Sequence, residues 1–277
     1  MNRQFADDGF CVIRNIANKN LIDNIISQFK ETVIHQLSLN RIDFAVGLDL
    51  DYYIRLLATN NLPAYFSCIK AAETFYSMYE LMVCSEIKKI CASAGFHTIS
   101  MPIRPAIHIV DPVISRLILK QNGFHELPQH QDWSALQSSI DTLVFWIPII
   151  DIDDSTPGIE LAPKSHLLGH LPTKAHQFGH TIVDSFQIDD QQFVKPHLFA
   201  GDLLVFSSFT VHRSESSLSF AENASRIALS FRASNINDLD FATRNYHRSY
   251  QTTIVYDHGK SLVSPQQVQD KMSAYCL

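Results

Sequence analysis

The sequence lacks long apolar runs and blocks of like charge. No run approaches the about 18 apolar residues that a membrane span needs. No five consecutive charges have the same sign, and the formal net charge of −6 gives no support for nucleic acid as a partner. The first residues include Asp7 and Asp8 and no apolar core, so they do not match an export signal. We therefore expect a soluble, cytoplasmic protein with no membrane partner.

Cysteine is scarce and follows no pattern. The five cysteines are Cys11, Cys68, Cys84, Cys91 and Cys276, without a Cys-x-x-Cys pair or zinc-like spacing. An odd number of cysteines and no export signal are typical of reduced thiols in a cytosol. A Gly-x-Ser-x-Gly elbow, a Gly-x-Gly-x-x-Gly run and a phosphate-binding loop are also missing. These absences argue against serine hydrolases and nucleotide-binding enzymes.

Apolar residues are plentiful, and those of the first third have helical spacing. Hydrophobic residues make up 46% of the 277 residues and charged residues 18%, which is enough for a sizeable core. A first helix is expected where Leu21, Ile22, Ile25, Ile26, Phe29, Val33 and Ile34 recur, behind Asn18 and Asn20 as caps. A second helical stretch is expected from about Tyr65 to Ala94, with Gly95 as its stop.

After Gly95 the sequence changes to short β-prone runs separated by Pro, Gly and Asp. Short strands at this spacing favour a sandwich or barrel over βαβ units. The expected strands are Phe96–Met101, Ala106–Val110, Arg116–Lys120, Asp141–Pro148, Ile159–Ala162, Thr181–Val183, Asp202–Phe206, Arg226–Arg232 and Thr253–Tyr256. Because no linker or repeat divides the chain, we expect one domain over residues 1–277. Its β core spans about 96–232 and its helical N-terminal layer about 15–95.

The triplet His130-Gln131-Asp132 places an imidazole and a carboxylate two residues apart. On an extended segment both side chains point to the same face, as two ligands of one metal ion require. With 13 His and 20 Asp in 277 residues, about one His-x-Asp triplet is expected by chance. Asp132 alone would more often be a turn or capping residue. The surrounding sequence therefore has to support a metal site.

His212 and Arg226 extend the triplet to a complete candidate site. His212 follows the expected strand Asp202–Phe206, so we expect it at a strand end or in a loop that returns to the triplet. Two histidines and one carboxylate form the facial triad that holds Fe(II) and leaves its other positions open. Taken alone, His212 would more often be an ordinary surface or core histidine. Arg226 follows 14 residues later and can hold a carboxylate through two hydrogen bonds.

Alternation in the expected strand that begins at Arg226 places this arginine on one face with Ala228 and Ser230. Small neighbours leave room for an anion beside the guanidinium group. The alternative is a surface ion pair of Arg226 with Glu215 or Glu222.

Other arginines compete as anion clamps. Arg232 lies in the same expected strand. Arg213 adjoins His212, so on an extended backbone it points away from a metal held there. Arg116 is a further candidate for facing the barrel interior.

Five segments follow one another in a fixed order. They are Gln129-His130-Gln131-Asp132-Trp133, Leu143–Ile149 with the acidic turn Asp151–Asp154, Thr156–His166, Gly201–Phe206, and the set His212, Ser214 and Arg226. In this order they resemble the phytanoyl-CoA dioxygenase family of Fe(II)/2-oxoglutarate oxygenases. The similarity covers about residues 96–232 and is weaker over Asp8–Ile13, which resembles the family's first strand. The turn Ser155–Gly158 has fewer glycines than the family's turn, which weakens any transfer of loop details.

This resemblance implies a mostly β fold with flanking helices, built around a double-stranded β-helix (jelly-roll, cupin-like) core. It implies Fe(II) as cofactor, 2-oxoglutarate as co-substrate and O2 as oxidant. The residues it implies are His130, Asp132 and His212 as catalytic metal ligands, Arg226 on the distal carboxylate of 2-oxoglutarate, and Ser214 and Trp146 in the co-substrate pocket. Trp146 is equally well explained as a core residue. Halogenating relatives carry a small residue at the position of Asp132, so this carboxylate favours hydroxylation or a related oxidation.

The resemblance implies oxidation of a small organic metabolite, with succinate and CO2 as products. The alternative is a metal-binding or ligand-binding relative, such as a sensor, without turnover. The complete ligand set together with Arg226 favours the enzyme.

The substrate itself stays open. Phe124, Trp133, Gln137 and Phe145 flank the triad in sequence, but core packing explains the aromatic ones equally well. No basic cluster supports the phosphates of an acyl-CoA, whereas the sequence around the triplet resembles that of bacterial relatives acting on small polar metabolites or glycans. A monomer and a homodimer both stay open.

Overall fold

An antiparallel sheet forms the centre of the computed structural model, which describes residues 3–16, 18–121, 123, 126–175, 181–183, 188–246, 261–273 and 275. Its strand order is β1-β8-β4-β10-β2, and β3 also pairs with β10. The strands are β1 (Phe10–Ile13), β2 (Ile99–Ser100), β3 (Ala106–Val110), β4 (Leu143–Pro148), β8 (Leu203–Ser207) and β10 (Arg226–Asn235). Smaller antiparallel pairs join β5 (Ile159–Leu161) to β9 (His212–Ser214) and β6 (Thr173–Ala175) to β7 (Thr181–Val183). The expected antiparallel β core is confirmed.

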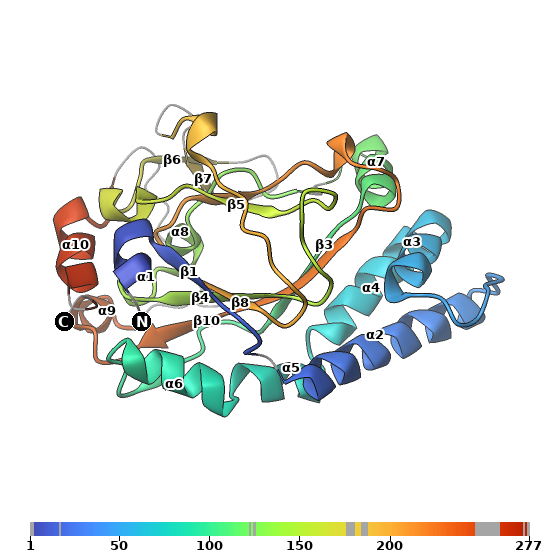
Figure 1. Ribbon diagram of the computed structural model, residues 1–277, viewed down its shortest axis with the longest axis horizontal. Helices are drawn as coiled ribbons and strands as arrows, with labels where there is room; N and C mark the ends of the chain where they lie inside the picture. The colour runs from blue at the N-terminus through green and yellow to red at the C-terminus, as the bar shows by residue number, and fades with distance from the viewer. Residues whose placement is uncertain are drawn as a thin grey trace.

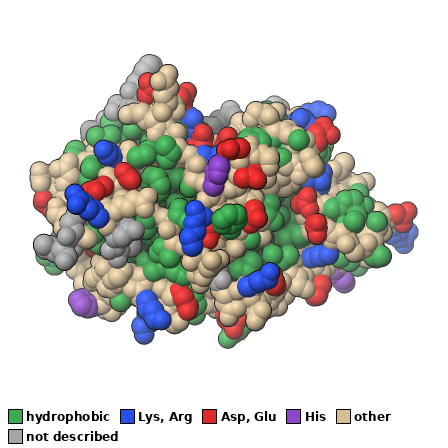
Figure 2. Space-filling view, in the orientation of Figure 1, with side chains coloured by type: hydrophobic (Ala, Val, Ile, Leu, Met, Phe, Trp, Pro, Cys, Tyr) green, Lys and Arg blue, Asp and Glu red, His purple; other side chains and the backbone are tan. Residues whose placement is uncertain are grey.

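Helices flank this core, and those of the N-terminal layer gather on the side of the main sheet opposite to β5 (Figure 1). That layer consists of α2 (Lys19–Leu39), α3 (Leu50–Asn60), α4 (Leu62–Ala72), α5 (Tyr76–Met82) and α6 (Ser85–Ser93). The other helices are α1 (Arg3–Asp8), α7 (Pro112–Lys120), α8 (Asp132–Leu136), α9 (Leu239–Thr243) and α10 (Pro265–Ser273). On the face in Figure 2, acidic and basic side chains are interspersed around apolar areas.

The first expected helix is confirmed as α2. Asn18 caps it by accepting a hydrogen bond from the Asn20 N–H, and Ile25, Phe29 and Val33 bury its apolar stripe. The second expected stretch is helical but broken into α4, α5 and α6. Each of α5 and α6 follows an extended residue without Gly or Pro, so apolar periodicity alone does not reveal the breaks. The helix α3 lies within the expected helical layer of about 15–95, although its own position was not predicted.

Alternation along the main sheet separates two apolar layers. In β4, Phe145 and Ile147 belong to the cluster that contains the buried residues of the N-terminal helices. Val144 and Trp146 belong to a second cluster, with Phe206 of β8 and residues of β5. One face of the main sheet is therefore covered by helices, and the other faces the strand pair β5–β9.

The expected balance of strand and helix was wrong, because more of the described residues lie in helices than in strands. One cause is the segment Arg116–Lys120, which was expected to be a strand and forms the second half of α7. Asp111 caps this helix through the N–H groups of Val113 and Ile114, and Pro112 occupies its first turn. The signals that start this helix therefore lie upstream of the segment that was expected to be a strand.

Several other boundaries moved. The strand expected at Phe96–Met101 is limited to Ile99–Ser100, whereas the strand expected at Arg226–Arg232 continues to Asn235. The strand expected at Thr253–Tyr256 lies outside the described residues. Within the described part of the chain, none of the helices has the length and apolar character of a membrane span.

Candidate metal and co-substrate site

His130 and His212 lie directly opposite each other. Their backbones form an isolated antiparallel bridge, in which the His130 N–H donates to the His212 carbonyl at 3.0 Å and the His212 N–H donates back at 3.1 Å. Opposed residues of an antiparallel pair point to the same side. The ring centroids are accordingly 4.1 Å apart. The bridge therefore brings together two histidines that are far apart in the sequence.

Asp132 completes the cluster from the first position of α8, not from a strand as expected. Although the backbone at Asp132 is helical, its carboxylate still faces both histidines. Asp132 Oδ1 lies 3.5 Å from His130 Nε2 and 3.8 Å from His212 Nε2. Two atoms bound to one ion through bonds of about 2.1 Å are at most about 4.2 Å apart. These three side chains can therefore hold a single metal ion.

Gln131 holds the triplet in place from the opposite side. Its amide nitrogen donates to the carbonyls of Gly169 and Phe209 at 2.8 and 2.7 Å, and its amide oxygen accepts from the Leu171 N–H at 2.9 Å. The side chain is 1% exposed. A residue between two candidate ligands thus anchors the segment in the core and fixes their direction.

The second nitrogen of each imidazole fixes its orientation. His130 Nδ1 lies 2.8 Å from the Pro128 carbonyl, and His212 Nδ1 lies 3.0 Å from the Thr210 carbonyl. A carbonyl can only accept, so Nδ1 carries the proton in both rings and Nε2 presents its lone pair to the cluster. In this tautomer the Nε2 atom of each ring is free to bind a metal ion.

Protonation states also suit a cation. Burial lowers the pKa of His212 to about 3, so the ring is neutral near neutral pH. Burial by itself raises the pKa of Asp132, but the positive charge of Arg232 acts together with the neighbouring His130 and His212 and holds this pKa well below its ordinary value. A neutral imidazole and an ionised carboxylate are the forms that a metal ion requires.

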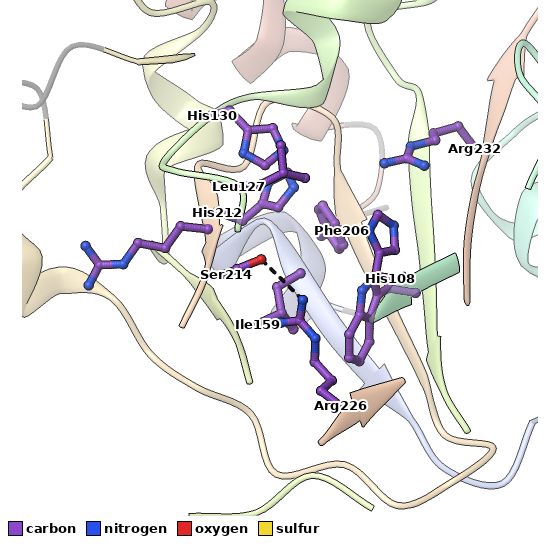
Figure 3. Close-up of a pocket in the computed structure, with 11 residues that line it drawn as sticks. His108, Leu127, His130, Ile159, Phe206, His212, Ser214, Arg226 and Arg232 are labelled. Carbon is purple, nitrogen blue, oxygen red and sulfur yellow. Dashed lines mark hydrogen bonds between the residues drawn. The ribbon is translucent and has the colours of Figure 1, made fainter. Parts of the chain in front are cut away.

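Arg226 lies at the other end of the same pocket (Figure 3). It donates to the Gly158 carbonyl and, from Nη2, to Ser214 Oγ at 3.2 Å. Its Nε is buried and has no hydrogen-bond partner among the described residues. Burial lowers the pKa of Arg226 to about 10, which leaves it charged near pH 7. A buried cation with an unused donor suits an anionic ligand.

The alternative considered for Arg226, a surface ion pair with Glu215 or Glu222, is not found in the described part of the chain. Glu215 pairs with Lys195 at 2.8 Å, and Glu222 pairs with Arg116, also at 2.8 Å. Arg116 lies on α7 with a side chain 42% exposed, so the suggestion that it faces the barrel was wrong.

Ser214 and Trp146 line the same pocket as Arg226. The guanidinium carbon of Arg226 lies 5.8 Å from the centre of the Trp146 ring. Trp146 is 3% exposed and belongs to the second apolar cluster. The same side chain is therefore packed in the core and lines the pocket.

The competing arginines are both occupied by carboxylates. Arg213 pairs with Glu160 and Asp190. Arg232 lies two positions beyond Ser230 on the inner face of β10 and contacts Asp132. Of the three arginines that line the pocket in the described chain, Arg226 is the one without a carboxylate partner.

Several pocket residues were not expected from the sequence. His108 of β3 lines the pocket, with Nε2 2.7 Å from Ser230 Oγ, and Leu127, Ile159 and Phe206 supply apolar walls. Alternation within the strands expected at these positions is the signal that would have found His108 and Phe206. For Leu127 no sequence signal exists, because it lies outside regular structure.

The residues suggested as substrate contacts are core residues where the structure describes them. Trp133 stacks on Phe209 and donates to the Ser138 carbonyl, and Phe145 stacks on Phe231 under the helical layer. Gln137 is buried at the end of α8. Phe124 lies outside the described residues.

Comparison with known proteins agrees with this geometry. The family model for phytanoyl-CoA dioxygenase (PhyH) matches residues 5–228. A 113-residue stretch is 28% identical to 1-deoxypentalenic acid 11-beta-hydroxylase of Streptomyces exfoliatus, covering 38% of this chain and 40% of that protein. The match thus spans less than half the length of this curated relative.

Two solved structures have a similar fold. The apo form of the non-heme monooxygenase ThoJ has a TM-score of 0.54 at 14% identity, over 98% of this chain and 97% of that one. The non-heme alpha-ketoglutarate-dependent epimerase SnoN from nogalamycin biosynthesis has a TM-score of 0.53 at 14% identity, over 84% and 80%. At this identity the likeness concerns the fold.

Proposed function

Because this chain belongs to the phytanoyl-CoA dioxygenase family, whose members depend on Fe(II) and 2-oxoglutarate, we propose that it oxidises a small organic molecule in a 2-oxoglutarate-dependent reaction. Hydroxylation is the proposed outcome, with succinate and CO2 as co-products. We further propose that residues 1–277 form one domain whose two facing sheets build a double-stranded β-helix. The cytoplasmic location stays a prediction.

One observation carries this proposal. The same pocket contains the His130, Asp132 and His212 cluster at one end and, at the other, Arg226 with a buried, unused N–H. A cluster without the arginine would suit any metal protein, and the arginine without the cluster would suit any anion site. Together they suit a metal ion and a dicarboxylate that reaches from the ion to Arg226.

The donor set fits the cofactor. Two neutral imidazoles and one carboxylate would hold Fe(II), and three ligands leave positions for a co-substrate and O2. Bound iron and 2-oxoglutarate supply the activation of O2. In this proposal Arg226 and Ser214 bind and orient the far carboxylate, while Ile159 and Phe206 keep water away from it.

The pocket favours a substrate without phosphate groups. Among the described lining residues, the charges of Arg213 and Arg232 are neutralised by Glu160 and Asp132, and Arg226 is assigned to the co-substrate. No further cation of that lining remains for the phosphates of coenzyme A. We therefore propose a neutral or weakly polar metabolite rather than an acyl-CoA. The curated relative is named for 1-deoxypentalenic acid and not for an acyl-CoA.

Anaerobic addition of Fe(II) and 2-oxoglutarate tests the assignment. The wild-type protein is expected to develop a weak visible charge-transfer band, which Asp132→Ala and His212→Ala both reduce. Arg213→Gln, which changes a neighbour of His212 whose guanidinium group pairs with Glu160 and Asp190, is the control and should keep the band. A missing band, or a band that survives both ligand substitutions, would show that the iron assignment is wrong.

Turnover separates an enzyme from a binding protein. Succinate release is to be measured with aerobic enzyme, Fe(II), 2-oxoglutarate and a panel of neutral metabolites, glycans and acyl-CoA thioesters. A substrate-dependent rise supports the oxygenase. A normal charge-transfer band without any rise over the whole panel supports the alternative of a non-catalytic relative.

A further inference from the structure

Arg232 makes a contact whose geometry is more specific than charge neutralisation. Its Nε and Nη2 donate to the same oxygen, Asp132 Oδ2, at 2.9 and 2.8 Å. The other oxygen, Oδ1, is the one that faces His130 Nε2 and His212 Nε2. The carboxylate is therefore divided, with one oxygen on the guanidinium group and the other toward the two histidines.

The guanidinium group is itself held in place. Its Nη1 donates to Ser230 Oγ at 2.8 Å, and this hydroxyl lies 2.7 Å from His108 Nε2. Arg232 is 9% exposed, and its strand β10, which pairs with β2, β3 and β4, is buried along its whole length. Three hydrogen bonds from a buried planar group leave Arg232 little freedom, so Asp132 Oδ2 has a fixed partner.

From this contact we infer that Arg232 is a positioning residue that restricts Asp132 to one-oxygen coordination of the metal. The inference rests on the proposed function. An octahedral ion with three protein ligand atoms keeps three open positions, two for a chelating co-substrate and one for O2. A carboxylate that bound through both oxygens would occupy one of these positions. By holding Oδ2, Arg232 keeps the third position open.

Metal binding alone provides the test, with Co(II) as a redox-stable, coloured probe and neither 2-oxoglutarate nor O2 present. Arg232→Gln is expected to weaken Co(II) binding by about 10- to 100-fold, as loss of a partner that orients a ligand typically does. It should also change the visible d–d spectrum of bound Co(II), because Oδ2 becomes free to join the coordination. A purely structural role for Arg232 would not change that spectrum.

Arg226→Gln is the matched control. It removes another buried arginine from the same strand and pocket, but Arg226 does not touch the candidate ligands. We expect wild-type Co(II) affinity and spectrum in this variant and weakened 2-oxoglutarate binding. If Arg232→Gln binds Co(II) with wild-type affinity and an unchanged spectrum, the inference is overturned.

A measurement on the wild-type protein covers the case in which Arg232→Gln does not fold. A crystal structure with Co(II) is expected to show Asp132 bound through Oδ1, with Oδ2 still on Arg232. Two-oxygen coordination, or a metal on Oδ2, overturns the inference. Failure of the proposed function would look different: the wild-type protein would then bind no Co(II), or would bind it just as well after Asp132→Ala.

Discussion

At the scale of single residues, burial sets the charge of several histidines, and His170 is the clearest case away from the candidate ligands. It is 3% exposed, its Nδ1 accepts from the Leu262 N–H at 3.1 Å, and its Nε2 lies 3.1 Å from Ser134 Oγ. Burial lowers the pKa of His170 to about 4. Protonation would also break the bond from Leu262, because Nδ1 could no longer accept.

The pKa of His170 predicts acid sensitivity. In the unfolded chain a histidine has a pKa of about 6.5. Between pH 6.5 and 4 the unfolded state binds a proton that the folded state does not, so the free energy of unfolding falls as the pH falls. One such group accounts for at most about 1.4 kcal/mol per pH unit. Urea unfolding of metal-free protein at pH 7 and pH 5 measures this loss.

Substitution isolates the contribution of this one side chain, since His108 and His212 have pKa values lowered to about 3 and add to the total. His170→Asn is expected to lose about 1–2 kcal/mol less than the wild type between pH 7 and pH 5. His197→Asn, which changes a histidine whose side chain is 58% exposed, is the control. Equal losses in all three proteins would contradict the prediction.

At the scale of elements, the joint between α1 and β1 is the tightest backbone approach near the site. Gly9 has φ of +84°. A Cβ atom there would lie 2.4 Å from His166 Nδ1 and 2.7 Å from Thr210 Oγ1. His166 Nε2 in turn lies 3.1 Å from the Ala6 carbonyl. His166, the last residue of the segment Thr156–His166, thus docks α1.

The close contacts at Gly9 predict that alanine destabilises the protein more at this position than at Gly47, which has nearly the same φ. Gly9→Ala is expected to destabilise the protein by about 2–5 kcal/mol, from left-handed strain plus steric overlap. Gly47→Ala has φ of +82° but no atom within 4 Å of the added methyl group, so strain alone should cost about 1–2 kcal/mol. Urea denaturation at pH 7 compares the two. Equal destabilisation would show that the contact with His166 is unimportant.

At the scale of the whole molecule, the pocket joins the main sheet to the strand pair β5–β9, since its lining comes from both. A ligand that binds only the folded state stabilises it by about 2.7 kcal/mol at a concentration of 100 times its Kd. In the presence of Mn(II), 2-oxoglutarate should therefore raise the thermal unfolding midpoint of the wild type. Arg226→Gln should lose most of this shift and keep the shift caused by Mn(II) alone. A full 2-oxoglutarate shift in Arg226→Gln would remove this arginine from the site.

Local patterns predicted the elements that depend on neighbours in sequence. The stripe of α2, the strands Ala106–Val110 and Thr181–Val183, and the face shared by Arg226 and Ser230 were all predicted from periodicity. The segment Arg116–Lys120 was predicted wrongly, because its short apolar run Leu117–Leu119 fits a strand as well as a helix, whereas the helix is started upstream by the cap at Asp111 and by Pro112.

The sequence by itself determined the family and the chemical types at the site, since His130, Asp132, His212 and Arg226 arrive in an order that carries the resemblance. Only the tertiary structure decided how they meet. The bridge between His130 and His212, the helical position of Asp132 and the division of its carboxylate by Arg232 depend on hydrogen bonds between segments about 80–100 residues apart. No local pattern encodes such contacts, because pairing across a sheet is fixed by the fold and not by neighbours in sequence.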